Sequence, residues 1–189
     1  YVEGLYRQHG ADRSGEGQLV CFGPNGADPH HAPNGTVLRD GDSVVLDIFI
    51  PIRRYWCDMT RTVFFRSVSD EGRRVYETVK AANLAAEAVI RPGVPMKDID
   101  RAARKHIEDA GCGPFFTHRL GHGCGLDCHE PPDNSASSPA VAEPGMVFSV
   151  EPGIYLPGKL GVRIEDLVLV TEDGCEVLNA YPKELQVVG

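Results

Sequence analysis

Residues 44–65 read VVLDIFIPIRRYWCDMTRTVFF. β-branched and aromatic residues fill this stretch on both sides of a short Pro-Ile-Arg-Arg segment at 51–54. This pattern predicts a β-hairpin with strands over residues 44–50 and 55–65. We therefore expect an antiparallel strand pair here, and the other elements are placed around it.

The flanking sequence predicts strands before and after two helices. Ser69 and Asp70 can cap the first helix, and Pro92 and Gly93 end it. Because strands and helices do not alternate as strand–helix–strand units, we expect an α+β fold with a mostly antiparallel sheet. The other elements expected are a helix ending at residue 10, a strand at 18–22, a turn at 23–26 within a loop reaching 35, helices at 70–90 and 96–110, a glycine-rich segment at 117–129, a loop at 131–144, and strands at 146–150 and 162–171.

Composition narrows the class of protein. The chain has 189 residues, of which 42% are hydrophobic and 24% charged, as is typical of a soluble globular protein. No apolar run approaches the roughly 18 residues that a membrane span requires. The net charge is −8 and basic residues do not cluster, so the electrostatic footprint of a nucleic-acid-binding protein is missing. The 21 glycines and 14 prolines argue against an all-helical bundle.

Cysteine usage and the N-terminus add two expectations. The six cysteines lie far apart and form no Cys-x-x-Cys pair, so we expect reduced thiols in a cytoplasmic protein. The first residues include neither an initiator methionine nor a signal-peptide core. The chain is therefore expected to be a fragment that lacks upstream sequence.

Two carboxylates interrupt the hairpin strands. Asp47 lies within Val-Val-Leu-Asp-Ile-Phe-Ile, and Asp58 follows Tyr-Trp-Cys on the second strand. If the hairpin turns about Ile52 and Arg53, the two aspartates face each other directly, with their Cβ atoms about 5 Å apart. Two anions at that distance repel, which favours a cation between or beside them.

Two further carboxylates interrupt apolar runs nearer the C-terminus. Glu151 ends Met-Val-Phe-Ser-Val, and Glu165 lies inside Val-Arg-Ile-Glu-Asp-Leu-Val, on the strand face of Arg163. A single strand carboxylate is more often paired with arginine, or solvated at an edge, than bound to a metal. Since only Arg61 and Arg163 are evident strand partners for four acids, the balance shifts towards a metal site.

Histidines supply the remaining ligand candidates. His9 and His106 fall on predicted helices and are expected to be solvated, whereas His118, His122 and His129 cluster in one glycine-rich segment. His122 is flanked by two glycines, which allow close approach of the backbone. It is therefore the histidine best placed to join the acids.

Four carboxylates and one imidazole form an oxygen-rich ligand set. This ligand set is typical of a site for Mn²⁺, Co²⁺, Fe²⁺ or a catalytic Zn²⁺ pair, rather than of a closed zinc site built from thiolates. Two such ions about 3.5 to 4 Å apart activate water and polarise a carbonyl group, which is hydrolytic chemistry. The alternative is a structural zinc knot of unusual spacing, formed by His122, Cys124, Cys128 and His129.

Five motifs in this sequence resemble those of the pita-bread metallopeptidases. They are Leu-Asp-Ile at Asp47, Cys-Asp-Met-Thr-Arg-Thr at Asp58, Gly-His-Gly-x-Gly-Leu-Asp-x-His-Glu at His122, Glu-Pro-Gly-Ile-Tyr at Glu151 and Val-Arg-Ile-Glu-Asp at Glu165. The similarity runs from about residue 19 to 188, and it favours the Xaa-Pro branch, prolidases and aminopeptidase P, over methionine aminopeptidases. It implies a curved, mostly antiparallel sheet with helices on its outer face. It also implies two divalent metal ions, manganese foremost, held by these five residues.

The resemblance also implies roles beyond metal binding. His30 and His129 match the two substrate-side histidines, and His129 would donate to the scissile carbonyl or its oxyanion. Glu151 would double as the proton acceptor for the attacking water. Arg163 would orient neighbouring carboxylates, and His118 would line the substrate pocket.

The implied function is hydrolysis of Xaa-Pro bonds through a metal-bridging hydroxide. The short connection between Glu151 and Glu165 resembles that of prolidases and favours a Xaa-Pro dipeptidase. Aminopeptidase P, a creatinase-like enzyme and a metal-free pita-bread binding protein stay open as alternatives. The expected partner is a small peptide with proline, and the resemblance allows a homodimer of the full-length protein. Residues 1–189 would form one catalytic domain that lacks its first helix and an N-terminal domain.

Overall fold

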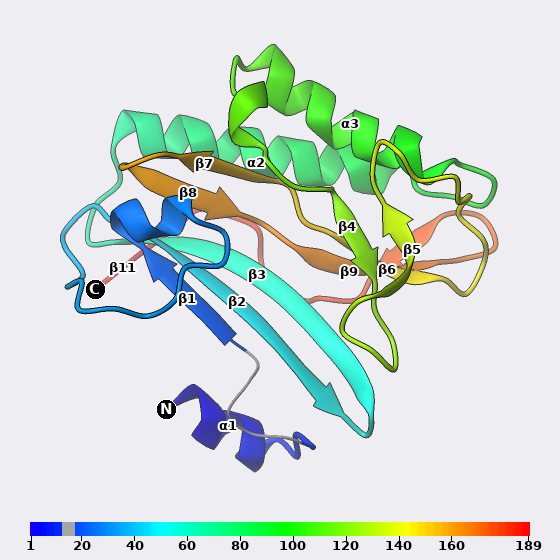
Figure 1. Cartoon of the computed structure of the whole chain (residues 1–189), viewed down its shortest axis with the longest axis horizontal. Coiled ribbons are helices and arrows are strands. Elements are labelled where there is room, and N and C mark those ends of the chain that lie inside the picture. The colour runs from blue at the N-terminus through cyan, green and yellow to red at the C-terminus, as the bar shows by residue number, and fades with distance from the viewer. Residues whose placement is uncertain (13–17) are drawn as a thin grey trace.

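A computed structural model describes residues 1–12 and 18–189. Its two longest strands, β2 (Ser43–Ile52) and β3 (Tyr55–Phe65), form the expected hairpin (Figure 1). β1 (Gln18–Phe22) pairs antiparallel with β2, and β11 (Gln186–Val188) pairs parallel with β3. The result is a four-stranded sheet in the order β1-β2-β3-β11.

A second, antiparallel sheet lies beside the hairpin, with five strands in the order β10-β9-β6-β4-β5. Its strands in chain order are β4 (Gly121–Gly123), β5 (Glu130–Asn134), β6 (Val147–Val150), β9 (Asp166–Val170) and β10 (Cys175–Val177). β7 (Gly153–Leu156) and β8 (Leu160–Arg163) form a separate two-stranded hairpin.

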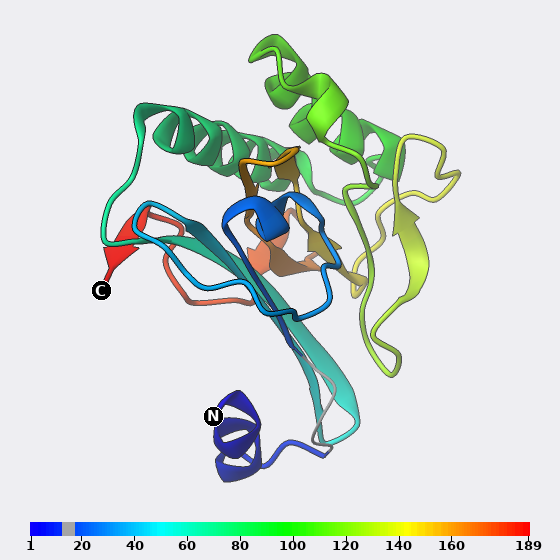
Figure 2. The same cartoon turned by 60° about the vertical axis from the view of Figure 1, so that its left-hand side comes forward.

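Two long helices cover one side of these strands. α2 (Asp70–Val89) and α3 (Met96–Asp109) lie next to each other, and the buried face of each joins the hydrophobic core with residues of β6, β8 and β9 (Figures 1 and 2). α1 (Val2–Gln8) lies near the far end of the β2-β3 hairpin (Figure 2). Two short 3₁₀ helices, η1 (Gly23–Ala27) and η2 (Gly113–Phe115), complete the described elements.

The expected α+β class with a mostly antiparallel sheet is confirmed. β1 occupies the residues predicted, and α2 and α3 end within one residue of their predicted limits. The predicted N-cap is present, because the Ser69 hydroxyl accepts a hydrogen bond from the Gly72 N–H at 3.0 Å. Among the described residues, none of the helices is both long and apolar enough to cross a membrane.

The predicted register of the hairpin is wrong by two residues. Asp47 pairs with Thr60 rather than with Asp58, and Phe49 pairs with Asp58. The turn is centred on Arg53 and Arg54, whose φ angles are 52° and 74°. Two left-handed residues give the turn the twist that a two-residue hairpin connection needs. Because a shift of two keeps every side chain on its face, Asp47 and Asp58 still share one side of the sheet.

Two further predictions need correction. The strand expected over residues 162–171 is broken at Ile164 and Glu165, because β8 pairs with β7 whereas β9 pairs with β6. Glu165 therefore lies at a junction between strands rather than inside one. The loop expected at 131–144 contains most of β5, which holds Pro131 and Pro132 at the edge of its sheet, where a missing N–H is tolerated.

Candidate functional site

A cavity of about 450 Å³ opens between the hairpin, β4 and the ends of β6 and β8. All nine side chains that the sequence nominated line it, although they come from segments far apart in the chain. These are His30, Asp47, Asp58, His118, His122, His129, Glu151, Arg163 and Glu165. Leu19, Phe49 and Trp56 contribute apolar wall. The structure thus brings the candidates together, while their roles stay predictions.

The glycines of β4 allow His122 to reach the cavity. A Cβ at Gly121 would lie 2.0 Å from the Ser149 carbonyl oxygen, and one at Gly123 would lie 2.4 Å from that of Pro131. Only glycine therefore lets β4 pass between β5 and β6 at this distance. His122 sits between these two positions and is 5% exposed.

The ring of His122 presents an unprotonated nitrogen to the cavity. Its Nδ1 lies 3.1 Å from the Gly123 carbonyl oxygen, and because a carbonyl only accepts, Nδ1 carries the hydrogen. Nε2 then faces Glu151 Oε1 at 3.3 Å and Asp58 Oδ2 at 3.8 Å. Burial lowers the pKa of His122 to about 4, so the ring is neutral near pH 7. His122 Nε2 is therefore an acceptor that faces two carboxyl oxygens, one of Glu151 and one of Asp58.

Burial and mutual repulsion perturb the carboxylates of the cavity. Desolvation is the largest cause that raises the pKa of Asp58, followed by the charges of Asp47 and Glu151. Desolvation likewise raises the pKa of Glu151 and of Glu165. Clustered carboxylates of this kind favour either bound protons or a cation among them.

Short hydrogen-bond relays hold two of these acids. The Thr60 hydroxyl accepts from Arg163 Nε at 3.1 Å and donates to Glu165 Oε2 at 2.6 Å. The Ser149 hydroxyl accepts from the His122 N–H at 3.0 Å and donates to Glu151 Oε1 at 3.1 Å. Each carboxylate is thereby fixed through one oxygen.

Asp47 is held from one side by Arg163. Its Oδ2 accepts from Arg163 Nη2 at 2.5 Å, and both side chains are largely buried. Its Oδ1 is buried as well, yet it has no hydrogen-bond partner among the described residues. A buried oxygen without a donor is costly, and at this position it fits a metal ligand.

Three candidate ligand atoms lie close enough together to bind one metal ion. One ligand atom each from Asp58, His122 and Glu165 lies within 4.8 Å of the other two. All three residues are buried. Carboxylate oxygens with one neutral imidazole nitrogen match the preference of Mn²⁺ and related divalent ions. The residues present therefore fit a metal centre.

His118 belongs to a chain of hydrogen bonds that ends at Arg163. Its Nδ1 lies 2.7 Å from the Arg119 carbonyl oxygen, so its Nε2 accepts from the Tyr155 hydroxyl at 2.9 Å. The Tyr155 oxygen in turn accepts from Arg163 Nη1 at 3.0 Å. Burial lowers the pKa of His118 to about 4. Both ring nitrogens of His118 are thus hydrogen-bonded, and the residue lines the cavity.

The two predicted substrate-side histidines lie at the mouth of the cavity. His30 and His129 are exposed residues on different loops. The ring centroid of His129 is 4.0 Å from that of His122, and burial lowers the pKa of His129. His31 points elsewhere, with its ring nitrogens near Asp28 and Asn34.

Among the described residues, the group whose ligand atoms lie within 4.8 Å of one another is Asp58, His122 and Glu165, and it includes neither Cys124 nor Cys128 of the alternative zinc knot. All six cysteines are free. Cys124 Sγ donates to the Trp56 carbonyl oxygen, and Cys128 Sγ lies 3.9 Å from Asp58 Oδ2. Burial raises the pKa of both thiols, which disfavours the thiolate that zinc requires.

Three residues of the site had no predicted role. Thr60 follows Asp58 by two, and Ser149 precedes Glu151 by two, so strand alternation could have placed both beside these acids. Tyr155 is the last residue of the Glu-Pro-Gly-Ile-Tyr motif and lies on β7, but the sequence gives no sign that its hydroxyl reaches Arg163.

Known proteins resemble this chain over almost its whole length. The sequence pattern of Metallopeptidase family M24 matches residues 1–172. An uncharacterized peptidase of Staphylococcus aureus (strain MRSA252) is 43% identical over 183 residues, which is 97% of this chain and 52% of that protein. The chain thus spans about half the length of the curated relatives it matches.

Solved structures agree with this match. The recombinant prolidase from Thermococcus sibiricus has a TM-score of 0.95 at 40% identity, covering 99% of this chain and 51% of that one. The Xaa-Pro dipeptidase from Bacillus anthracis has the same TM-score at 39% identity, covering 99% and 53%. Their mixed helices and antiparallel sheets match, which confirms the pita-bread fold. The chain belongs to metallopeptidase family M24.

Proposed function

We propose that this chain is the catalytic part of a metal-dependent peptidase that cleaves Xaa-Pro bonds. Two divalent ions, preferably Mn²⁺, would be held by Asp47, Asp58, His122, Glu151 and Glu165. One observation carries the proposal: one ligand atom each from the buried residues Asp58, His122 and Glu165 lies within 4.8 Å of the other two. A bound cation resolves that arrangement of acceptors.

Each residue of the cavity has a separate role in the proposed hydrolysis. The ions, when bound, would polarise the peptide carbonyl and lower the pKa of an attacking water. Glu151, whose pKa is raised by burial, accepts the proton of that water and passes it to the leaving proline nitrogen. His129 donates a hydrogen bond to the carbonyl oxygen as negative charge develops on it. Arg163 holds Asp47 and, through Thr60, Glu165 in place.

A small proline-containing peptide suits the cavity. A volume of about 450 Å³ lies at the lower end of the range for small-molecule sites. The solved structures that resemble this chain include a prolidase and a Xaa-Pro dipeptidase, and also an X-Pro aminopeptidase from Thermotoga maritima. We favour the dipeptidase, because the connection between Glu151 and Glu165 is short. The cytoplasmic setting expected from the sequence is part of the same proposal.

Peptide hydrolysis by the intact protein tests this proposal. Protein stripped with a chelator should not cleave Ala-Pro, and addition of Mn²⁺ should restore cleavage. Glu165→Gln serves as a matched variant, because it preserves shape while removing one anionic ligand. Cleavage of Ala-Pro that persists in the chelator would contradict metal dependence. Faster cleavage of Ala-Pro-Ala than of Ala-Pro would instead assign aminopeptidase P activity.

A further inference from the structure

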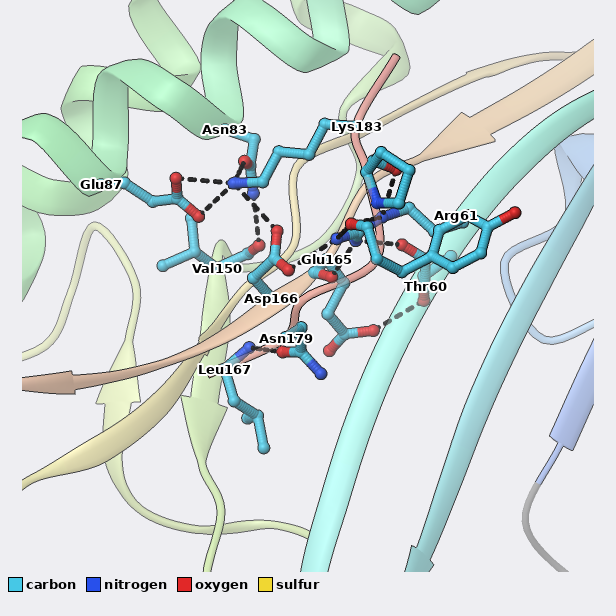
Figure 3. Close-up of polar contacts among 12 residues, drawn as sticks. Thr60, Arg61, Asn83, Glu87, Val150, Glu165, Asp166, Leu167, Asn179 and Lys183 are labelled. Atoms are coloured by element: carbon cyan, nitrogen blue, oxygen red, sulfur yellow. Dashed lines mark hydrogen bonds and ion pairs between the residues drawn. The ribbon is translucent and has the colours of Figure 1, made fainter. Parts of the chain in front are cut away.

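Residues 179–183, here called the back segment, do not line the cavity. They nevertheless contact the strands that carry the candidate metal ligands (Figure 3). The segment follows β10 and precedes β11, and it adopts no regular secondary structure. Its contacts run to β3, to β9 and to α2, as the following distances show.

Asn179 links the backbone beside two ligands. Its side-chain Nδ2 donates to the carbonyl oxygen of Asp58 at 3.1 Å. Its Oδ1 accepts from the Leu167 N–H on β9 at 2.6 Å. Leu167 lies two residues after Glu165, so one amide group bridges the backbones of both ligand-bearing segments. An amide that donates and accepts in this way fixes their separation.

Arg61 forms the second bridge. The buried guanidinium donates from Nη1 to the carbonyl oxygen of Glu165 at 2.6 Å and from Nη2 to Asp166 Oδ1 at 2.7 Å. The same Nη2 donates to the Tyr181 carbonyl oxygen of the back segment at 2.7 Å. The guanidinium group is planar and rigid. Arg61, which lies on β3, therefore links the backbone of Glu165 to the backbone of the back segment.

Lys183 extends this network of polar contacts to α2. Its Nζ lies 3.0 Å from Asp166 Oδ2 and 2.6 Å from both carboxylate oxygens of Glu87. It also donates to Asn83 Oδ1 at 2.7 Å, and Asn83 Nδ2 donates to the Val150 carbonyl oxygen at 2.9 Å. Val150 immediately precedes Glu151. The ammonium therefore reaches the backbone next to a third ligand.

We propose that the back segment positions the metal ligands Asp58 and Glu165, the first through Asn179 and the second through the ion pair of Lys183 with Asp166, the residue next to Glu165. The inference rests on the proposed metal centre. Carboxylates that repel one another spread apart unless the surrounding structure holds them, and a ligand set held in place binds an ion more tightly. Asn179 and Lys183 are thus positioning residues that touch neither ion nor substrate.

The test is the Mn²⁺ dissociation constant of the chelator-stripped intact protein, measured by isothermal titration calorimetry. Asn179→Ala and Lys183→Met should each weaken Mn²⁺ binding by about 10- to 100-fold, the usual effect of removing groups behind metal ligands. Tyr181→Phe is the matched control, because the hydroxyl of the exposed Tyr181 donates to Gln186 Oε1 at 2.9 Å and not to a ligand-bearing segment. It should alter the constant by less than about twofold.

A second control separates positioning from general loss of stability. Ile107→Ala leaves a cavity in the core at a side chain that is fully buried on α3, so it lowers the melting temperature. It should leave the Mn²⁺ dissociation constant unchanged. Equal weakening in Ile107→Ala and Asn179→Ala would overturn the inference. Wild-type Mn²⁺ affinity in Asn179→Ala would also overturn the inference. Because Asn179 is partly exposed, this variant still decides the question if Lys183→Met does not fold. Absence of Mn²⁺ binding by the wild type would instead refute the proposed function itself.

Discussion

Replacement of Arg163 by methionine should strongly destabilise the metal-free protein. Arg163 and Asp47 form an ion pair at 2.5 Å, with side chains that are only 4% and 10% exposed. Arg163 also donates to the hydroxyls of Thr60 and Tyr155. Methionine retains much of the volume but removes the charge and all of these hydrogen bonds. Asp47 would then be a buried carboxylate with no hydrogen-bond partner on either oxygen among the residues that the structure describes.

The size of the effect follows from this burial. Removing one partner of a buried ion pair costs about 3 to 5 kcal/mol. Each kcal/mol shifts the melting temperature by about 2 to 4 °C in a domain of this size. The chelated Arg163→Met protein should therefore melt about 6 to 20 °C below the chelated wild type. Saturating Mn²⁺ should narrow the gap, because a cation beside Asp47 replaces part of the lost charge.

Thermal unfolding followed by circular dichroism measures this difference. Arg66→Met is the control, because Arg66 pairs with Asp40 at the surface with both side chains more than half exposed. An exposed pair contributes about 0 to 1 kcal/mol, so this variant should melt close to the wild type. If Arg163→Met did so as well, Arg163 would not be what holds Asp47 in the cavity.

Three further predictions concern catalysis, pH and the cysteines. His30→Ala and His129→Ala should keep wild-type Mn²⁺ content and lose about 100-fold or more of kcat on Ala-Pro; loss of metal would show that either histidine is a ligand instead. Burial raises the pKa of Asp58 from 3.8 to about 8, so the folded apoprotein binds more protons than the unfolded chain in this range. Above about pH 7, where His118 and His122 are largely neutral in both the folded and the unfolded state, urea titrations of the chelated protein should therefore give an unfolding free energy that falls as pH rises towards 8, and a flat profile there would contradict this. Cys128→Ser should retain Mn²⁺, whereas loss of the metal would revive the zinc-knot interpretation.

The sequence was most informative where burial alone decides the structure. Val79 on α2 and Ile99 on α3 are fully buried, and each belongs to a set of apolar residues at helical spacing. The four strand carboxylates were singled out because an unpaired charge in an apolar strand is costly. All four line one cavity, which agrees with the cost of burying each charge alone.

The hairpin register shows where such reasoning stops. Turn position depends on which two residues adopt left-handed backbone angles, and here both are arginines. Arginine carries no local preference for that conformation, unlike Asn-Gly. Strand pairing on both sides, rather than the turn residues, fixes the register. The face shared by Asp47 and Asp58 was still predicted, since it depends only on alternation.

The back segment could not have been recognised at all. Lys183 follows a proline in a stretch without apolar periodicity, and a lysine there reads as solvated. Its side chain is only 15% exposed, because Asn83 and Glu87 of α2 and Asp166 of β9 converge on it from two distant segments. Such long-range pairing leaves no local signal in the sequence.

We propose that the cavity holds two divalent ions on the five candidate ligands. Anomalous diffraction at the manganese edge, from crystals of the intact protein grown with Mn²⁺, tests this metal centre. Two anomalous peaks are expected in the cavity. The atoms around them would be carboxylate oxygens of Asp47, Asp58, Glu151 and Glu165 and the Nε2 atom of His122. A cavity without a peak, or a peak beside the thiols of Cys124 and Cys128, would contradict it.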